Sequence, residues 1–132
     1  MTGETIREAV RVLERGGLVV YPTETCYGLG ADATNPEAIK KVYLLKKRPL
    51  DKPLSVIVDS LEMIRMYAVI SKDVEKLIEE YMPGPVTLVV KNKSFPRILC
   101  GGELTVGFRI PDHVIAFELV IVTVPPTPLL RL

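Results

Sequence analysis

Apolar residues follow a helical spacing in several stretches of the chain. Within Thr5–Arg15 they recur every three or four residues, so they fall on one face of a helix, and the pair Gly16-Gly17 ends it. Asn35 and Pro36 are typical N-cap and first-turn residues, and they predict a helix over Glu37–Lys47. Similar patterns predict further helices over 59–67, 71–81 and 111–119, the first two capped by Asp59/Ser60 and Ser71.

Short, continuous apolar runs alternate with these helices and predict buried strands. The runs are Leu18–Tyr21, Leu54–Val58, Val86–Val90, Val106–Ile110 and Val120–Val124. Because strands alternate with helices, we expect the α/β class, with an open sheet covered on both faces. The last residues, 125–132, are apolar and rich in proline, and we expect no role for them in a core.

The composition is that of one globular domain. With 132 residues, 48% hydrophobic and 25% charged, we expect a single domain over residues 1–132. Lys and Arg number 17 and Asp and Glu 16, so the net charge is +1, which excludes a whole-molecule field that attracts nucleic acid or membranes. No apolar run reaches the ~20 residues of a membrane span. The N-terminus lacks the pattern of a signal peptide, so we expect a cytoplasmic location.

The cysteine and histidine content argues against a protein-bound metal. Cys26 and Cys100 lie far apart and form no CxxC pair, so they cannot make a zinc site alone, and a disulfide between them is not implied. His113 is the only histidine, which makes a histidine metal centre or a Ser-His-Asp triad an unlikely default.

The segment YPTETCYGLG at 21–30 is the first candidate for ligand binding. A predicted strand runs into hydroxyls, a carboxylate and two glycines, and loops at strand ends are where α/β sheets bind ligands. Thr23 and Thr25 could bind a small polar substrate, and the glycines allow close backbone approach. The alternative is a plain strand-turn-strand with a bulge, which composition alone favours.

The segment 40–52 concentrates positive charge. Six cations face one carboxylate, Asp51, which leaves +5 in a nearly neutral chain. Lys46, Arg48 and Lys52 surround a predicted helix end, where they could converge on phosphates. The alternative is a solvated helix face whose cations complement the helix dipole. For these three residues the sequence favours neither the phosphate site nor the solvated face. The remaining cations of the segment are Lys40, Lys41 and Lys47.

Two further segments carry candidate residues. The rigid turn at 82–87 is expected to shape the backbone. Arg109 lies within an apolar strand, where a charge needs a partner, so it could bind a ligand carboxylate or pair with an internal acid such as Glu24. Asp112 is expected to cap the next helix. Together the hydroxyls and cations suggest an anionic ligand, a small polar ligand and a site that works by positioning and electrostatics.

Four segments, in order, resemble the motifs of the YrdC family, the threonylcarbamoyl-AMP synthases. They are YPTETCYGLG at 21–30, KKRPLDKPLSV at 46–56, PGPVT at 83–87 and VGFRIPDH at 106–113. Four motifs in the right order are a more specific match than any one of them, and the resemblance covers roughly positions 5–118. It implies a YrdC-like, open, twisted, mixed sheet with helices on both faces and a positively charged cavity.

The resemblance also implies a reaction. L-threonine, bicarbonate and ATP would give threonylcarbamoyl-AMP and pyrophosphate, and the product would feed the N6-threonylcarbamoyladenosine (t6A) modification of tRNA. Mg²⁺ would accompany ATP, and contacts with RNA or with other t6A-modification proteins are expected partners. Lys46 and Arg48 match the family's KxR pair and would be catalytic. The ligand contacts would be Thr25 and Arg109 for L-threonine, and Arg48, Lys52 and Thr105 for ATP.

The C-terminal part departs from the family pattern. The family continues into an SxN motif that contacts both substrates, and no Ser-x-Asn occurs here. Ile57 is a second departure, since some relatives place a histidine there. We therefore expect a chain truncated or frame-altered after about residue 119. The alternative function is a catalytically impaired nucleotide- or double-stranded-RNA-binding protein. Carbamoyl-phosphate chemistry, found where a related domain is joined to acylphosphatase-like and zinc-finger segments, is disfavoured.

Overall fold

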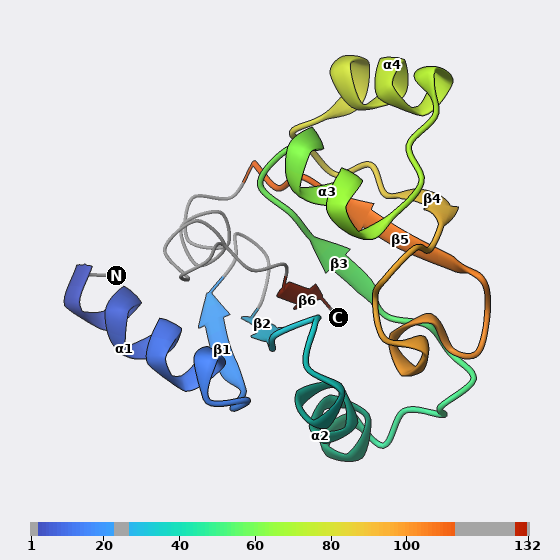
Figure 1. Cartoon of the computed structure of the whole chain (residues 1–132). Coiled ribbons are helices and arrows are strands. Elements are labelled where there is room, and N and C mark those ends of the chain that lie inside the picture. Colours follow the sequence, from blue (N-terminus) through green and yellow to red (C-terminus); the bar gives the residue numbers. More distant parts are fainter. Residues whose placement is uncertain (1–2, 23–26, 113–128, 132) are drawn as a thin grey trace.

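The computed structural model describes residues 3–22, 27–112 and 129–131 (Figure 1). The helices predicted up to residue 81 are confirmed within a few residues at each end. An additional 3₁₀ turn, η1, had not been predicted. In chain order the elements are α1 (Gly3–Glu14), β1 (Val19–Pro22), β2 (Tyr27–Gly30), α2 (Pro36–Lys46), β3 (Ser55–Ile57), α3 (Leu61–Tyr67), α4 (Lys72–Tyr81), β4 (Leu88–Lys91), η1 (Arg97–Cys100), β5 (Thr105–Arg109) and β6 (Leu129–Arg131).

Side-chain caps fix the starts of α2, α3 and α4, as predicted. The Asn35 side chain accepts hydrogen bonds from the backbone N–H groups of Glu37 (3.0 Å) and Ala38 (3.4 Å) at the start of α2. Ser60 and Ser71 each accept a backbone N–H bond three residues ahead, at 3.2 Å. Each cap satisfies an N–H group that has no partner within its own helix.

The strands form a hairpin and a mixed four-stranded sheet. β1 pairs antiparallel with β2, and the larger sheet has the order β4-β5-β3-β6. Within it β3 and β5 are parallel, and the other pairs are antiparallel. The expected mixed α/β class is confirmed. β2 contacts β6, so the hairpin packs beside the edge of the larger sheet (Figure 1).

Strand β6 lies in the C-terminal tail, where the sequence did not predict a strand. Its three residues pair with β3, with Leu130 opposite Val56. A run this short after three prolines has no strand pattern of its own, so only the partner strand determines its conformation. The predicted helix over 111–119 does not include Pro111 and Asp112, which are not helical. The rest of that helix and the strand predicted over 120–124 lie outside the described residues.

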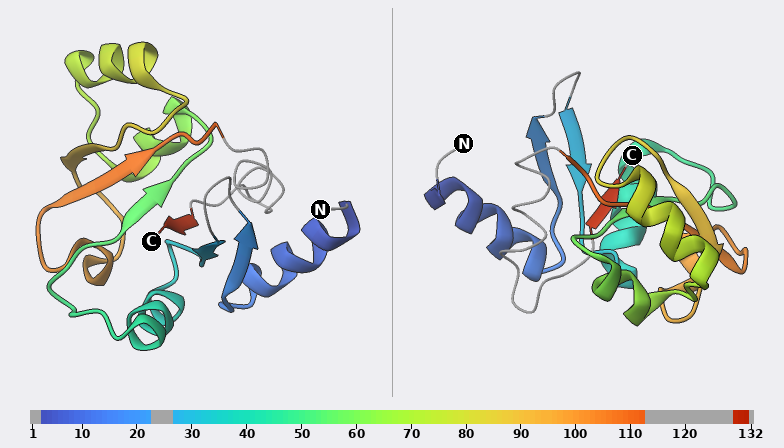
Figure 2. Two further views of the ribbon diagram at one scale, coloured as in Figure 1. Left: turned by 180° about the vertical axis from the view of Figure 1, so that it is seen from behind. Right: turned by 90° about the horizontal axis from the view of Figure 1, so that it is seen from above.

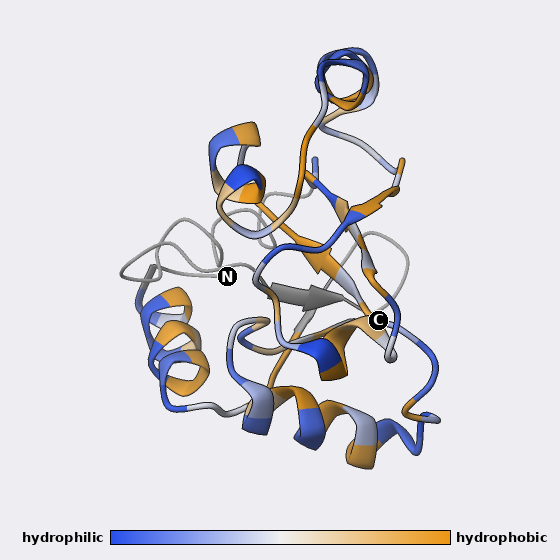
Figure 3. Cartoon of the chain, turned by 45° about the vertical axis from the view of Figure 1, so that its right-hand side comes forward, coloured by the Kyte–Doolittle hydropathy of each residue, from blue (hydrophilic) through white to orange (hydrophobic). Residues whose placement is uncertain are grey.

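The core is one-sided on β5, whereas β3 is buried on both faces, through Val56 and Ile57. On β5, Val106 and Phe108 are buried, whereas the alternate residues are exposed or half-buried. The helices show alternating hydrophilic and hydrophobic bands, as amphipathic helices do (Figure 3). α1 lies beside β1, on the far side of the molecule from α4 (Figure 2). In the part of the chain that the structure describes, none of the helices is long and apolar enough to cross a membrane.

Phe108→Ala tests this one-sided burial. Phe108 is fully buried, so we expect the free energy of unfolding to fall by about 3–5 kcal/mol, measured by urea denaturation. Val89→Thr on the neighbouring strand is the control. Val89 is 68% exposed, and its change should stay below about 0.5 kcal/mol. Equal losses in both variants would contradict the prediction.

Candidate functional site

One face of the four-stranded sheet carries polar side chains around a glycine. Successive strand residues point to opposite faces, so Thr105, Gly107 and Arg109 share the face of β5 that does not bury Phe108. A Cβ added at Gly107 would lie 3.3 Å from Thr87 Cγ2 and 3.4 Å from Ser55 Oγ. We call Thr105, Gly107, Arg109, Ser55 and Thr87 the polar sheet face.

Thr105 and Arg109 lie at opposite ends of this face. They are four residues apart on β5, which corresponds to about 13 Å at the usual strand rise. The parallel register places Ser55 beside Gly107, so Lys52, which precedes β3, lies towards the Thr105 end. The structure thus brings Lys52 towards the predicted ATP residue Thr105 and separates both from the predicted threonine residue Arg109.

The backbone around Arg109 is held from two sides. The N–H of Val58 donates to the Arg109 carbonyl at 3.1 Å, and the N–H of Gly84 donates to the Ile110 carbonyl at 3.0 Å. Gly84 belongs to the turn at 82–87, so the expected backbone role of that turn is confirmed by its contact with the end of β5. The Arg109 side chain is half-buried, with its Nε inaccessible to solvent. This position suits a cation that meets a ligand carboxylate at low local dielectric.

The basic segment divides into cations with different roles. Lys41 donates to the carbonyl of Gly16 at 3.0 Å, and Lys40 pairs with Glu37 at 3.3 Å. These two lysines therefore already have contacts within the protein, Lys40 along α2 and Lys41 with the end of α1. Lys46 and Lys52 are exposed, as a phosphate site at the protein surface requires.

Arg48 closes the loop that follows α2. Its Nη2 donates to the Pro53 carbonyl at 2.8 Å, and its Nε donates to the Lys52 carbonyl at 3.4 Å. These bonds engage two of the five guanidinium N–H groups. Arg48 therefore shapes the loop that carries Lys52, and its predicted contact with ATP stays a prediction.

Tyr43 and Gly101, which sequence reasoning missed, also contact the loop after α2. The Tyr43 hydroxyl lies near the carbonyls of Lys52 (2.7 Å) and Ile98 (3.2 Å), so it joins α2, the loop and η1. Gly101 has φ +61°, and a Cβ there would lie 2.8 Å from the carbonyl oxygen of Asp51. The pair Gly101-Gly102 is a sequence signal for such a close approach. Tyr43 carries no such signal, because it occupies an apolar helix position.

Burial raises the pKa of Tyr43, an effect that the nearby Arg48 charge partly offsets. Burial also raises the pKa of the Cys100 thiol, which is free and buried in η1. A thiol of this kind is a poor nucleophile and a poor metal ligand. Across residues 3–22, 27–112 and 129–131 no group of three histidine, cysteine or carboxylate side chains could hold a metal ion.

The segment 21–30 forms a hairpin. β1 and β2 pair antiparallel from Val19 opposite Gly30 to Pro22 opposite Tyr27, an arrangement that both the ligand-binding hypothesis and the plain strand-turn-strand alternative allow. The predicted threonine contact, Thr25, lies in the connection at 23–26, outside the described residues. Its role therefore stays a prediction.

Known proteins are similar to this chain in sequence and architecture. A model of the Sua5, YciO and YrdC proteins, described as telomere recombination, matches residues 11–126. The threonylcarbamoyl-AMP synthase of Pyrococcus abyssi is 42% identical over 117 residues, which are 87% of this chain and 34% of that protein. The threonylcarbamoyl-AMP synthase of Bacillus subtilis is 39% identical over 119 residues, again 87% of this chain and 34% of the relative.

Solved structures extend the likeness to the whole chain. P. abyssi Sua5 complexed with L-threonine superposes with a TM-score of 0.92 at 36% identity, over 100% of this chain and 39% of that one. E. coli YciO superposes with a TM-score of 0.86 at 25% identity, over 99% of this chain and 64% of that one. The chain thus spans about a third of the length of the two synthases named above.

Gly101→Ala tests the close approach of η1 to the loop. Gly101 and Gly102 both have positive φ (+61° and +84°), so alanine strains the backbone at each by about 1–2 kcal/mol. Only at Gly101 would the new methyl group meet the loop, because nothing lies within 4 Å at Gly102. We expect Gly101→Ala to lose about 1–3 kcal/mol more than Gly102→Ala in urea denaturation. Equal losses of stability in the two variants would show that the loop moves aside from the new methyl group at no cost.

Tyr43→Phe tests the hydroxyl bridge. Removal of the hydroxyl takes away the single O–H donor that the Lys52 and Ile98 carbonyls share, and we expect a loss of about 1–3 kcal/mol at neutral pH. Tyr81→Phe, at a tyrosine that is 47% exposed, should be nearly neutral.

The same pair of variants has a pH dependence with a defined sign. The pKa of Tyr43 is higher in the folded protein than its ordinary 10.0, so its neutral form favours folding. This contribution is present below pH 10 and is lost as the pH rises above it. Tyr43→Phe should therefore lose less stability above pH 10 than the parent chain, although Tyr67, whose pKa burial also raises, retains part of the effect. If the stability of Tyr43→Phe and of the parent chain changed identically with pH, the raised pKa of Tyr43 would be contradicted.

Proposed function

The chain belongs to the Sua5/YciO/YrdC family, and from this premise we propose that it makes threonylcarbamoyl-AMP from L-threonine, bicarbonate and ATP. The product would serve t6A modification of tRNA in the cytoplasm. The observation that carries the proposal is the likeness, at a TM-score of 0.92 over the whole chain, to a relative complexed with L-threonine. The polar sheet face would supply the charged and hydroxyl groups that such a ligand requires.

The proposed reaction has two steps. The amine of L-threonine attacks the carbon of bicarbonate, and a carbamate and water result. A carbamate oxygen then attacks the α-phosphorus of ATP, and the bond to the β-phosphate oxygen breaks, which releases pyrophosphate. No described side chain needs to form a covalent intermediate, so the protein would act by orientation and charge.

Arg109 would hold the carboxylate of L-threonine. A guanidinium is always charged and presents paired N–H donors that match a carboxylate. It lies at the end of β5, where the N–H of Val58 donates to the Arg109 carbonyl and the N–H of Gly84 donates to the Ile110 carbonyl. These backbone hydrogen bonds limit the movement of Arg109. Thr25, in the connection between β1 and β2, would be the second threonine contact.

The opposite end of the polar sheet face would receive the triphosphate. Lys46 and Lys52 are exposed, Arg48 orders the loop between them, and Thr105 ends the same face. We propose Lys46 and Arg48 as the catalytic pair, and Arg48, Lys52 and Thr105 as ATP contacts. The separation of about 13 Å along β5 leaves room for the threonyl part and the phosphates of one extended ligand.

We propose that a magnesium ion arrives with ATP, because Mg²⁺ is commonly held by substrate phosphates, water and one or two carboxylates. When bound, the ion would neutralise phosphate charge. Lys46, Arg48 and Lys52 would supply the protein's share of positive charge.

Pyrophosphate release by the 132-residue chain tests the proposal. Release from ATP that requires both L-threonine and bicarbonate is the expected result. A folded chain, verified by circular dichroism, that binds ATP without such release would instead favour the nucleotide- or double-stranded-RNA-binding alternative.

Arg109→Gln tests the carboxylate contact. We expect the KM and the Kd for L-threonine to rise about tenfold or more, because a hydrogen bond to a charged group contributes about 1.5–3 kcal/mol. The affinity for ATP should change little. Arg97→Gln, an exposed arginine on η1, is the matched control. Calorimetric titration with each substrate distinguishes the two effects, and an unchanged Kd for L-threonine would refute the assignment.

A further inference from the structure

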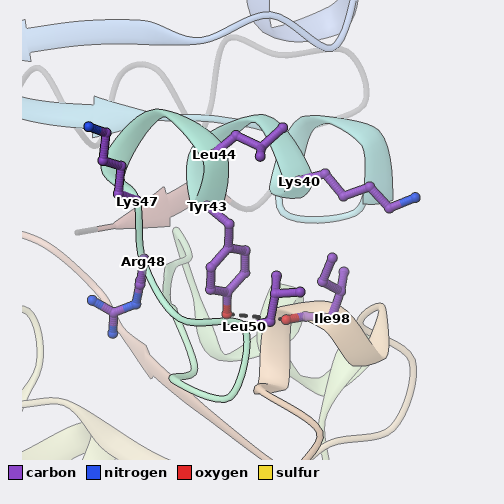
Figure 4. A pocket seen from close by; sticks show the side chains of 7 residues that line it. All are labelled: Lys40, Tyr43, Leu44, Lys47, Arg48, Leu50 and Ile98. Atoms are coloured by element: carbon purple, nitrogen blue, oxygen red, sulfur yellow. Dashed lines mark hydrogen bonds between the residues drawn. The ribbon is translucent and has the colours of Figure 1, made fainter.

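A pocket of about 440 Å³ lies against α2 (Figure 4). It contains none of the residues of the polar sheet face, and Arg48 is the one residue that it shares with the proposed ATP contacts. Its walls are the ring of Tyr43 and aliphatic side chains from α2, the following loop and η1. Cations from α2 and the loop stand around it. The lining residues are Tyr43, Leu44, Leu50 and Ile98, with Lys40, Lys47 and Arg48; we call this pocket the Leu44 groove.

The Leu44 groove exposes apolar side chains that do not contribute to the buried face of α2. α2 already buries one face through Ala38, Ile39, Val42 and Tyr43. Leu44 is nevertheless 78% exposed, and Leu50 is 62% exposed across the groove from it. Contiguous exposed apolar side chains with a polar rim are typical of protein–protein contact sites.

Two of the surrounding cations are available to a partner. Figure 4 shows Lys40 and Lys47 pointing outward at opposite ends of the groove, with Leu44 between them. Lys40 pairs with Glu37, but both side chains are exposed (55% and 75%), so the pair is weak and can be displaced. Arg48 already donates to the loop carbonyls. Among the residues that the structure describes, no carboxylate lines the groove.

The spacing of these cations defines a complementary ligand. Lys40 and Lys47 are seven residues apart, which corresponds to about 10 Å along a helix. A partner helix with two carboxylates seven residues apart matches both charges. Leucines midway between its carboxylates then face Leu44 and Leu50.

We propose that the Leu44 groove docks an acidic amphipathic helix of another protein. Helix-in-groove recognition by apolar anchors with a complementary charged rim is a common mode of protein binding. RNA fits less well, because Tyr43, the aromatic side chain in the groove, is 2% exposed and cannot act as a stacking platform. The proposal does not depend on the proposed enzymatic function.

Fluorescence anisotropy with designed peptides tests the proposal. The probe is an 18-residue, alanine- and glutamine-based helical peptide with two glutamates seven residues apart and two leucines between them. Two matched peptides carry glutamine or lysine in place of the glutamates. We expect saturable binding of the acidic peptide, weaker binding of the neutral one and none of the basic one.

Variants locate the site. Leu44→Gln should raise the Kd of the acidic peptide about tenfold or more, as expected for a central anchor. Lys47→Glu should weaken the binding of the acidic peptide and allow the basic peptide to bind. Leu44 is exposed, so the first variant should fold normally, which thermal melting verifies. Met66→Gln, at a methionine 63% exposed on α3, and Lys76→Glu on α4 are the controls and should leave the Kd unchanged.

Three results would overturn the proposal. One is the absence of saturable binding of the acidic peptide. Another is binding that Leu44→Gln and Lys47→Glu leave unchanged. The third is binding of a duplex RNA that Lys47→Glu abolishes and Leu44→Gln does not, in a protein that fails to bind the acidic peptide; this would assign the surface to nucleic acid.

Discussion

The parallel pairing of β3 with β5 is the interaction on which both the core and the polar sheet face depend. It sets Val56 beside Phe108 and Ser55 beside Gly107. Val56 and Phe108 are fully buried, whereas Ser55 is half-buried next to Gly107. Because side chains alternate between faces, a shift of one residue along β5 would exchange its buried positions, Val106 and Phe108, with its polar ones. The free energy of core burial therefore also places the polar groups.

The loop after α2 depends on side chains for its backbone hydrogen bonds. Its residues belong to no helix or strand, so their carbonyls need other donors. Tyr43 and Arg48 supply hydrogen bonds to Lys52 and Pro53, and Gly101 lets η1 approach the same segment. As a result α2, the loop and η1 are joined at one place. This arrangement holds the loop through the backbone carbonyl of Lys52 and leaves Lys46 and Lys52 exposed.

Much of the local structure could be predicted from the sequence. The caps Asn35, Ser60 and Ser71 act within four residues of the chain, so residue type alone predicts where their helices begin. The strands around Val56 and Phe108 were found from their apolar runs. β6 and η1 were missed, because a three-residue strand and a single 3₁₀ turn have no periodicity of their own.

The sequence by itself determined which chemical groups are available and the family to which their order belongs. Arg109 in an apolar strand already indicated a carboxylate partner. Only the tertiary structure decided that Arg48 donates to carbonyls of its own loop, that Gly107 lies between Ser55 and Thr87, and that the leucines of α2 remain exposed. These are contacts between neighbouring strands and across a folded loop. Periodicity and residue type specify the direction of a side chain within its element, but the register and packing of the elements decide what it meets.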